Sequence, residues 1–450
     1  MSEARPFSHR DVGTSEPAWL LDAAWDRVPR LDLDAVLVRC SRVVVVAPHP
    51  DDETLGLGAT LADLQMRGVD VTVVFVTHGG EADPRRAEGD RALAALGSGV
   101  SSVWWDLPDG ALDRVQDQLC LRLTPLIDGR TVLFAPLETD GHADHDAVAR
   151  VAETVARRQS AMLLHYPIWL WHWATPYDME WDRVRVLAPS LHGLRAKSSA
   201  IECYTSQLVA TDGFPIVGSA VLARAYRVVE TVLIPAAPDL SVRVAEFINP
   251  GRRRATIAQP FDDMFDSGGD DPWHLDDFAY ERRRFDVVLA CLGRERYPRI
   301  LEVGCATGQL TQLLAGRADE VVAMDASERA LSVARTRSDR VRWLHGAAPA
   351  DLPGGPFDLV VLSEIGYFLD GEELLATLRA ARRLVPEWGE IVLAHWRGPV
   401  SDTPLDGAVV HAQATALLDL PLRARYEDAD LLVEVWGRPV SVYDEYRGRS

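Results

Sequence analysis

A run of apolar β-branched residues that ends abruptly in charged ones is the feature that most restricts the fold of this chain. Residues 42–47, RVVVVA, lead into the turn PHPDDE and then into Thr54–Arg67, a segment with helical spacing that ends at Gly68. Strands buried on both faces of a parallel sheet read as continuous Val-rich runs, and a helix commonly follows each of them. The segment therefore predicts a buried strand of a parallel α/β sheet.

The same alternation continues along the chain and starts again after an interruption. Between Pro235 and Asp277 the composition changes to Pro, Gly, Asp and Arg. Before it, strands are expected at Val71–Val76 and Thr131–Ala135 and a helix at Arg85–Leu96; after it, helices at about Tyr280–Leu292 and Gln309–Leu314 and strands at Arg299–Val303, Glu320–Met324, Phe357–Leu362 and Glu390–Ala394.

We therefore predict two α/β domains, each a mostly parallel sheet flanked by helices. A length of 450 residues also exceeds one ordinary core. The predicted parts are an N-terminal extension (1–39), a first domain (40–237), a linker (238–270) and a second domain (271–450).

Composition limits the partners of the protein. The formal net charge of −20 opposes nucleic acid and anionic membranes as main partners, because both would repel the chain. The five cysteines are odd in number and scattered, which is typical of reduced thiols. The polar N-terminus shows no signal peptide, and no apolar run reaches the length of a membrane span. We expect a cytoplasmic protein that acts on a small molecule, with an oligomeric state that the sequence does not indicate.

Two clusters of histidines and acids follow predicted strands. His49, Asp51 and Asp52 come after the first strand, and His142 and His145, in GHADH, come after TVLFAP. Ligand sites form at the carboxyl ends of parallel strands. For one cluster alone, a helix N-cap is the competing interpretation. Two clusters together favour zinc or a similar divalent ion held by two His and one carboxylate, with an open position for water, a spare acid as base and a spare His for the oxyanion.

These residues resemble the PIG-L (LmbE-like) zinc-dependent N-deacetylases, which act on N-acetylglucosaminyl conjugates. PHPDDE and GHADH match the two signature motifs of that family, and VTHGGEAD, WDLPDGAL and AKSSAIECYTSQ add to the match over residues 40–235. The resemblance implies a Rossmann-like fold and an N-acetylamino-sugar conjugate as substrate. It implies His49, Asp52 and His145 as metal ligands, Asp51 as general base and His142 as the support of the tetrahedral intermediate. Pro48 replaces the Ala that is more common in the family.

The segment 163–181, LLHYPIWLWHWATPYDMEW, is dense in aromatic residues. Its first half is expected to be a buried strand, because Trp often fills a core. For the loop Trp171–Tyr177 we expect contact with the substrate.

A second candidate site begins at RILEVGCATGQLTQLL, residues 299–314. Gly304 and Gly308 permit a tight turn and close approach of a ligand, but the dinucleotide fingerprint GxGxxG is absent. The next strand ends in Asp325, whose carboxylate can accept both hydroxyls of a ribose. A nucleoside without a diphosphate points to S-adenosylmethionine. The competing interpretation is a plain turn with Asp325 as a helix cap.

The second domain resembles the class I S-adenosylmethionine-dependent methyltransferases, most of all the nodulation-protein-S type that N-methylates an amino sugar. DDPWHLDDFAYERRRF, ILEVGCATG, FDLVVLSEIGYFL and LAHWRGPVSDTPLDGAVVH carry this resemblance over residues 268–450. The expected cofactor-binding residues are Glu302, Gly304, Ala306, Gly308, Asp325, Ala347 and Trp273, with His274 beside the last. Ala306 replaces a usual glycine, which is tolerable with an ordinary φ. Ala347 offers only its backbone where an acid is common, and Asp351 is a weak substitute.

Glu364, Tyr367 and His395 follow predicted strands and are expected to orient or deprotonate an amine in line with the transferred methyl group. The competing interpretations are Tyr367 as a core residue and His395 as a hydrogen-bonded strand end.

A deacetylase releases a primary amine and an amine N-methyltransferase consumes one. The sequence therefore predicts a bifunctional tailoring enzyme that deacetylates and then N-methylates an amino-sugar conjugate. Two alternatives stay open: activities on different substrates or on oxygen, and a second domain that only binds or regulates.

Overall fold

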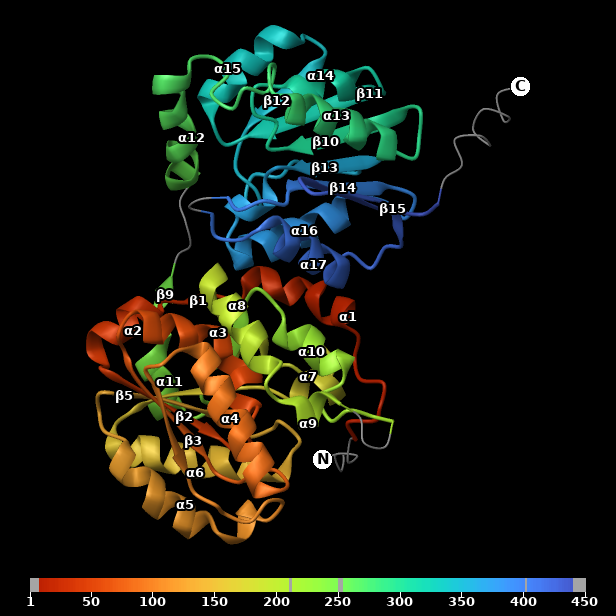
Figure 1. The fold of residues 1–450 in the computed structure, drawn as a ribbon. Coiled ribbons are helices and arrows are strands. Elements are labelled where there is room, and N and C mark those ends of the chain that lie inside the picture. Colours follow the sequence, from red (N-terminus) through yellow and green to blue (C-terminus); the bar gives the residue numbers. More distant parts are fainter. Residues whose placement is uncertain (1–7, 210–212, 250–253, 401–402, 440–450) are drawn as a thin grey trace. The chain divides into compact units, whose positions relative to one another are not determined.

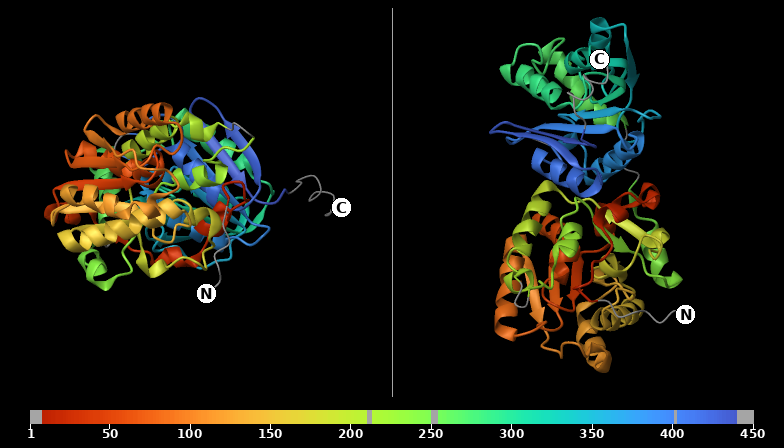
Figure 2. Two further views of the ribbon diagram at one scale, coloured as in Figure 1. Left: turned by 90° about the horizontal axis from the view of Figure 1, so that it is seen from below. Right: turned by 90° about the vertical axis from the view of Figure 1, so that its right-hand side faces the viewer.

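The computed structural model describes residues 8–209, 213–249, 254–400 and 403–439, and the chain divides into two units, Met1–Pro250 and Gly251–Ser450 (Figure 1). Each unit contains one mixed, mostly parallel sheet with helices on both faces (Figure 2). The predicted fold class is confirmed for both units.

The sheet of the first unit has nine strands in the order β4-β3-β2-β5-β6-β8-β7-β1-β9. The five strands from β4 to β6 are parallel, whereas β8 is antiparallel to both of its neighbours. The strands are β1 (Arg30–Leu31), β2 (Arg42–Ala47), β3 (Asp70–Phe75), β4 (Val100–Trp104), β5 (Thr131–Pro136), β6 (Met162–Tyr166), β7 (Val184–Leu187), β8 (Glu230–Leu233) and β9 (Ile248–Asn249).

Helices flank this sheet and connect its strands. They are α1 (Glu16–Leu20), α2 (Leu33–Arg39), α3 (Asp52–Met66), α4 (Ala82–Leu96), α5 (Gln116–Leu123), α6 (Ala143–Gln159), α7 (Leu170–Trp173), α8 (Leu191–Ile201), α9 (Thr205–Leu208), α10 (Ser219–Ala225) and α11 (Pro238–Ala245), with short 3-10 helices η1 (Ala23–Arg27), η2 (Leu112–Arg114), η3 (Thr124–Leu126) and η4 (Trp181–Arg183).

The valine run of β2 lies between two hydrophobic cores. Val43 and Val45 pack in the core that includes α3 and α8, and Val44 and Val46 pack in the core that includes α5 and α6. A strand with apolar neighbours on both faces needs no polar alternation. This explains why the charged residues begin only where β2 ends.

The segment predicted as an N-terminal extension is part of the first unit over its described residues. β1 pairs with β7, and Trp19 and Trp25 are buried against Trp171, with ring centroids 4.8 Å and 6.3 Å away. Because these contacts span about 150 positions of the chain, local pattern does not reveal them. Trp171 is therefore a core residue, which corrects the expectation that it contacts substrate, and Tyr177 is 98% exposed.

The sheet of the second unit has seven strands in the order β12-β11-β10-β13-β14-β16-β15, of which the last two are antiparallel to their neighbours. The strands are β10 (Tyr297–Val303), β11 (Ala318–Asp325), β12 (Val341–His345), β13 (Leu359–Ser363), β14 (Glu390–Trp396), β15 (Leu422–Glu427) and β16 (Leu431–Trp436). The helices are α12 (Arg254–Gly268), α13 (Ala279–Cys291), α14 (Gln309–Ala315), α15 (Glu328–Arg337), α16 (Gly371–Leu384), α17 (Gly407–Leu417) and the 3-10 helix η5 (Gly366–Phe368).

The division between the units falls inside the segment 238–270 that the sequence indicated as a linker. Much of that segment is nevertheless regular. α11 and β9 belong to the first unit, and α12 belongs to the second. The Pro- and Gly-rich composition therefore marks the boundary between the units, although helices and a strand occupy much of the segment that was predicted as a linker.

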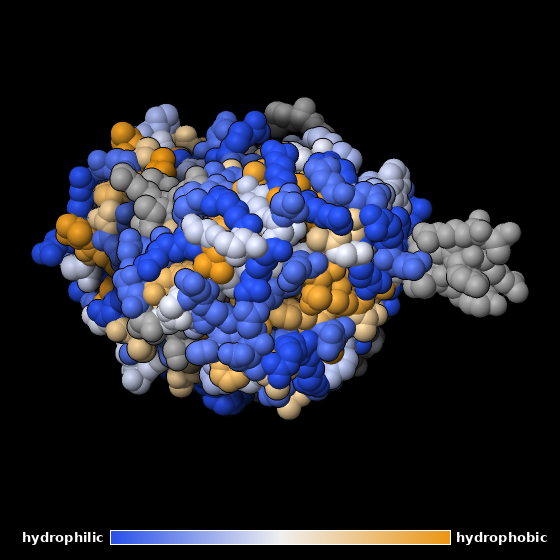
Figure 3. Space-filling view, turned by 90° about the horizontal axis from the view of Figure 1, so that it is seen from above, coloured by the Kyte–Doolittle hydropathy of each residue, from blue (hydrophilic) through white to orange (hydrophobic). Residues whose placement is uncertain are grey.

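One face of the molecule is covered mostly by hydrophilic residues, with hydrophobic residues in smaller groups between them (Figure 3). Within the described part of the chain, no helix is both long and apolar enough to cross a membrane. All five cysteines are unpaired.

Candidate functional sites

Two imidazole nitrogens and one carboxylate oxygen converge where β2 and β5 end. The Oδ2 atom of Asp52 lies 3.3 Å from Nδ1 of His49 and 3.3 Å from Nε2 of His145. Tetrahedral zinc with bonds of 2.0–2.1 Å places its ligand atoms roughly 3.3 Å apart. The Nε2 atom of His145 is buried and has no hydrogen-bond partner among the described residues. Asp52 thus reaches both histidines, and one ring nitrogen each of His49, His142 and His145 lies within 4.8 Å of the others, which makes this cluster a candidate cation site.

The opposite nitrogen of each of these histidines faces a carboxylate. His145 Nδ1 lies 2.7 Å from Asp140, and His49 Nε2 lies 3.3 Å from Asp144 and 3.1 Å from Asp109. A carboxylate that accepts from one ring nitrogen fixes the tautomer and leaves the other nitrogen free to bind a metal. Asp140 and Asp144 thus orient the two histidines.

Asp140 was not among the predicted residues. It is fully buried, and its carboxylate also accepts the backbone N–H groups of Ile168, Trp169 and Leu170 at 2.9–3.0 Å. Its position one residue before GHADH is the only local signal, since the segment 168–170 lies far along the chain.

The charge of the cluster also suits a cation. Burial lowers the pKa of His145, but the carboxylates of Asp52 and Asp140 outweigh this effect and raise that pKa to about 9. Burial raises the pKa of Asp52, but His145 and His49 outweigh this effect and hold that pKa well below its usual range. A divalent cation would take the place of the two protons that His49 and His145 otherwise carry, so the carboxylates that stabilise those protons would also stabilise the cation.

Asp51 is beside these atoms but does not cap α3, which excludes the N-cap interpretation for it. Its side chain makes no capping hydrogen bond, and its φ of 136° is rare for a residue with a side chain. Burial raises the pKa of Asp51 to about 7, against the opposing effect of Arg85, whose Nη2 lies 3.4 Å away. A buried carboxylate with a pKa near neutrality suits a general base. Arg85 was missed by sequence reasoning.

His142 is the N-cap of α6, and the capping hydrogen bond determines which of its ring nitrogens carries the hydrogen. Its Nδ1 accepts the backbone N–H of Asp144 at 3.3 Å at the start of α6. Burial and the nearby His145 and His49 lower the pKa of His142 to about 4, so the ring is neutral and its Nε2 carries the hydrogen. Its ring centroid lies 4.8 Å from that of His49. A neutral N–H donor beside the cation position is suited to a developing oxyanion.

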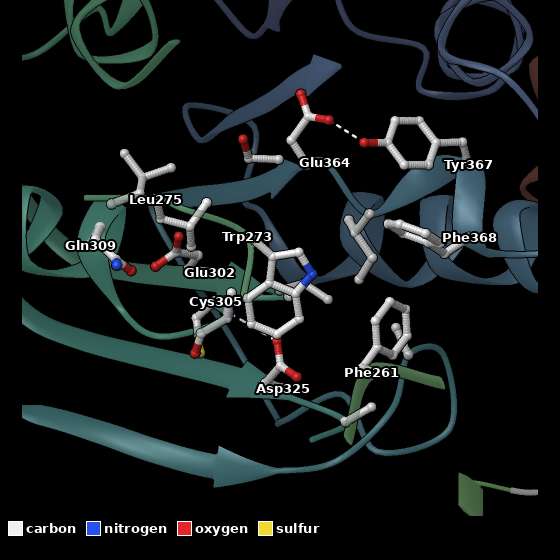
Figure 4. A pocket seen from close by; sticks show the side chains of 18 of the residues that line it. Phe261, Trp273, Leu275, Glu302, Cys305, Gln309, Asp325, Glu364, Tyr367 and Phe368 are labelled. Carbon is white, nitrogen blue, oxygen red and sulfur yellow. Dashed lines mark hydrogen bonds between the residues drawn. The ribbon is translucent and has the colours of Figure 1, made fainter. Parts of the chain in front are cut away.

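The second unit contains a cavity of about 280 Å³ at the carboxyl ends of β10, β11 and β13 (Figure 4). Asp325 lines it, and its two oxygens accept the backbone N–H groups of Ala306 and Ser327, each at 2.9 Å. Ser327, not Asp325, is the N-cap of α15. The interpretation of Asp325 as a helix cap is therefore excluded.

Glu302 lines the same cavity and is 2% exposed. Its Oε2 has no hydrogen-bond partner among the described residues, and burial raises the pKa of Glu302 to about 8. A buried carboxylate with an unused oxygen is costly unless a cationic group pairs with it. A cationic group of a ligand, such as an ammonium, would therefore suit this position.

The turn between β10 and α14 contains both predicted glycines and an alanine, Ala306, and all three have a positive φ. Gly304 and Gly308 have φ of 76° and 87°, and a Cβ atom on Gly308 would lie 2.9 Å from Trp343. Ala306 also has a positive φ, of 46°. This corrects the expectation of an ordinary φ there, and the left-handed conformation costs an alanine roughly 1–2 kcal/mol.

Two further predicted cofactor residues, Ala347 and Trp273, line the cavity. The backbone N–H of Ala347 donates to Asp351 at 2.9 Å, so the Asp351 carboxylate is used within its own turn. Trp273 lies among the side chains of the cavity in Figure 4 and packs edge-on against Phe265, with centroids 5.3 Å apart. His274 is not among the lining residues and packs against Phe278 instead.

At another part of the cavity Glu364 accepts hydrogen bonds from two tyrosines. Tyr280 donates at 3.0 Å and Tyr367 donates to the other oxygen (Figure 4). Burial raises the pKa of Glu364, against the opposing effect of Arg284, and its φ is 58°. Tyr280, 84 residues away in sequence, was not predicted.

His395 does not line this cavity. It is fully buried, its Nε2 accepts the backbone N–H of Gly366 at 3.0 Å, and its Nδ1 lies 3.1 Å from His411. Both ring nitrogens are thus used within the protein. His395 is therefore a hydrogen-bonded internal residue, and the prediction that it contacts the amine is corrected.

Comparison with known proteins gives a family match in each unit. Residues 44–156 match the family model described as GlcNAc-PI de-N-acetylase (PIG-L), and residues 264–409 match the model of nodulation protein S (NodS).

Individual relatives match parts of the chain. Nodulation protein S of Rhizobium tropici is 27% identical over 184 residues, which are 38% of this chain and 77% of the relative. The chain spans about half, 55%, of the length of the Bradyrhizobium diazoefficiens relative of the same name, at 32% identity over 24% of this chain. The 1D-myo-inositol 2-acetamido-2-deoxy-alpha-D-glucopyranoside deacetylase of Corynebacterium glutamicum is 51% identical over 43 residues, which are 10% of this chain and 15% of the relative.

Proposed function

We propose that the protein removes the N-acetyl group of an amino-sugar conjugate and then N-methylates the freed amine with S-adenosylmethionine, because residues 44–156 match the PIG-L family model and residues 264–409 match the NodS model. The observation that carries the hydrolytic half is that the Asp52 carboxylate lies 3.3 Å from one ring nitrogen each of His49 and His145, in the same cluster as His142.

In the first reaction Asp51 acts as the base and His142 as a hydrogen-bond donor beside the cation position. A divalent cation held by His49, Asp52 and His145 would supply Lewis-acid chemistry for the attack of water on an amide carbonyl. Asp51 accepts the proton that the attacking water loses and returns it to the departing amine. The Nε2–H of His142 donates to the carbonyl oxygen as negative charge develops on it.

In the second reaction the cavity holds the cofactor and Glu364 receives the amine. S-adenosylmethionine supplies the electrophilic methyl group. Glu302 and Asp325, which line the cavity at the ends of β10 and β11, would hold its ammonium and ribose. Glu364, fixed by Tyr280 and Tyr367, accepts an N–H of the amine and takes up the proton that the amine loses on methylation.

The order of the two reactions follows from the chemistry of the amine. An acetamide nitrogen is a poor nucleophile because its lone pair is delocalised into the carbonyl, whereas the primary amine left by deacetylation attacks readily. The name of the Corynebacterium glutamicum relative, a deacetylase of a 2-acetamido-2-deoxy-glucopyranoside, supports an acetylated amino sugar as the class of substrate. The resemblance of residues 264–409 to nodulation protein S implies an amino-sugar nitrogen as the methyl acceptor.

A mass-spectrometric time course tests this proposal. The purified protein, loaded with zinc, is incubated with a panel of N-acetylhexosaminyl conjugates with and without S-adenosylmethionine. The proposal predicts loss of acetyl without the cofactor, followed by gain of methyl on the same molecule when it is present. Loss of acetyl with no methyl gain on any freed amine would overturn the sequential function, and methyl gain on oxygen would overturn N-methylation.

A further inference from the structure

A chain of buried hydrogen bonds runs behind the cavity of the second unit and ends at the turn that carries Tyr367. Glu434 on β16 faces His411 on α17, with Oε2 2.7 Å from Nδ1. His411 Nε2 lies 3.1 Å from Nδ1 of His395 on β14, and His395 Nε2 accepts from Gly366 at 3.0 Å. The three side chains are 1%, 3% and 0% exposed, so water does not compete for these bonds.

The backbone donor at one end of the chain and the carboxylate at the other require the same proton positions along it. Gly366 N–H can only donate, so His395 Nε2 accepts and the hydrogen of His395 is on Nδ1. That hydrogen points to His411 Nε2, which must accept, so the hydrogen of His411 is on Nδ1 and points to Glu434. Each group then has one donor matched to one acceptor, and the carboxylate stands at the accepting end. Arg425 donates to the other oxygen of Glu434 at 2.6 Å.

The close contact between the backbone N–H of Gly366 and His395 Nε2 requires a glycine at position 366. A Cβ atom at this position would lie 2.5 Å from Val410 and 2.9 Å from His395 Nε2, so no side chain fits. The preceding residues are tied to the same strand, because the backbone N–H of Glu364 donates to Ala394 O at 2.8 Å. The end of β14 therefore holds both Glu364, whose φ of 58° is strained, and the turn that presents Tyr367.

We propose that Glu434, His411 and His395 form a relay that fixes a single tautomer of His395 and thereby positions Glu364 and Tyr367 for the methyl acceptor. His395 and His411 are positioning residues and do not touch substrate. The consequence for the reaction rests on the proposed N-methyltransferase function, whereas the tautomer does not.

The first test is nitrogen NMR of the full-length protein with ring-labelled histidine, with the His395 signals assigned by loss in His395→Gln. The relay predicts that His395 is neutral with its hydrogen on Nδ1. A hydrogen on Nε2, or a protonated ring at pH 7, would overturn it. This result stands even if the wild-type protein methylates no amine, so a failure of the proposed function is recognised separately.

The second test compares His411→Leu with Leu417→Ala, a buried control on the same helix outside the relay. Because a small misplacement of acceptor groups costs about 10- to 100-fold in rate, His411→Leu should lower kcat/KM for the free amine by that factor and leave S-adenosylhomocysteine affinity within about twofold. Leu417→Ala should lower the melting temperature without this kinetic loss. In Glu434→Gln, whose amide oxygen still accepts, His395 should keep its tautomer. Equal kinetics in His411→Leu and Leu417→Ala would refute the positioning role.

Discussion

His145 Nδ1 lies 2.7 Å from the carboxylate of Asp140, and this pair sets which ring nitrogen of His145 is presented to the cation position. The same carboxylate accepts three backbone N–H groups from the segment 168–170, so its position is fixed. The candidate cation site is therefore supported by backbone groups of a segment outside the two histidine-bearing motifs.

Asp140→Asn is expected to weaken metal binding while leaving every ligand in place. The amide would offer either a donor or a weaker acceptor to His145 Nδ1, and loss of such an orienting carboxylate typically costs 10- to 100-fold in metal affinity. Zinc affinity measured by competition with a chelator checks this. Glu138→Gln, an exposed neighbour two residues earlier, is the matched control and should bind zinc as the wild type does. Unchanged affinity in Asp140→Asn would contradict the role of the pair.

Asp51→Ala is expected to separate the two activities. General-base catalysis contributes about 10²- to 10⁴-fold, so deacetylation should fall by that factor while the zinc content stays the same. Methylation of the acetylated conjugate should then stop, and methylation of the free amine should continue. The exposed Asp113→Asn serves as control. If the acetylated and free substrates were still methylated equally, the sequential order would be wrong.

Glu302→Gln is expected to change how cofactor binding depends on pH. The pKa of Glu302 is raised to about 8, above its unfolded value, so the apo protein loses stability as pH rises from the unfolded pKa toward 8. Pairing with an ammonium needs the charged form, so S-adenosylmethionine affinity should rise between pH 6 and 8. Calorimetry should detect proton release on binding at pH 7 in the wild type and none in Glu302→Gln. A pH-independent wild-type affinity would argue against the pair.

Ala306→Gly is expected to stabilise the second unit. Glycine adopts the φ of 46° without the penalty that an alanine carries, which is worth up to about 1 kcal/mol after the entropy of the unfolded chain is counted. Ala380→Gly, inside α16, should instead destabilise the unit by about 1 kcal/mol. Thermal unfolding with and without S-adenosylhomocysteine identifies the transition of this unit. Equal destabilisation by both substitutions would mean that the backbone at Ala306 is not left-handed.

Much of the framework was predictable because it depends on neighbours in sequence. The β2 strand was predicted at the residues where it occurs, and the strands and helices around it within a few positions, since continuous apolar runs and helical spacing are local signals. The structure also brings His49, Asp52, His142 and His145 together, because the carboxyl ends of parallel strands share one edge of the sheet.

The sequence by itself thus determined two α/β units, the two sets of motifs at their strand ends and the classes of chemistry that these residue types permit. Only the tertiary structure decided which carboxylate orients His145, that Tyr280 reaches Glu364, that His395 is turned away from the cavity, and that Trp19 and Trp25 complete the first core. The physical reason is distance along the chain. Each of these outcomes depends on side chains from separate elements that meet only after packing, and no local spacing encodes the direction in which such side chains point.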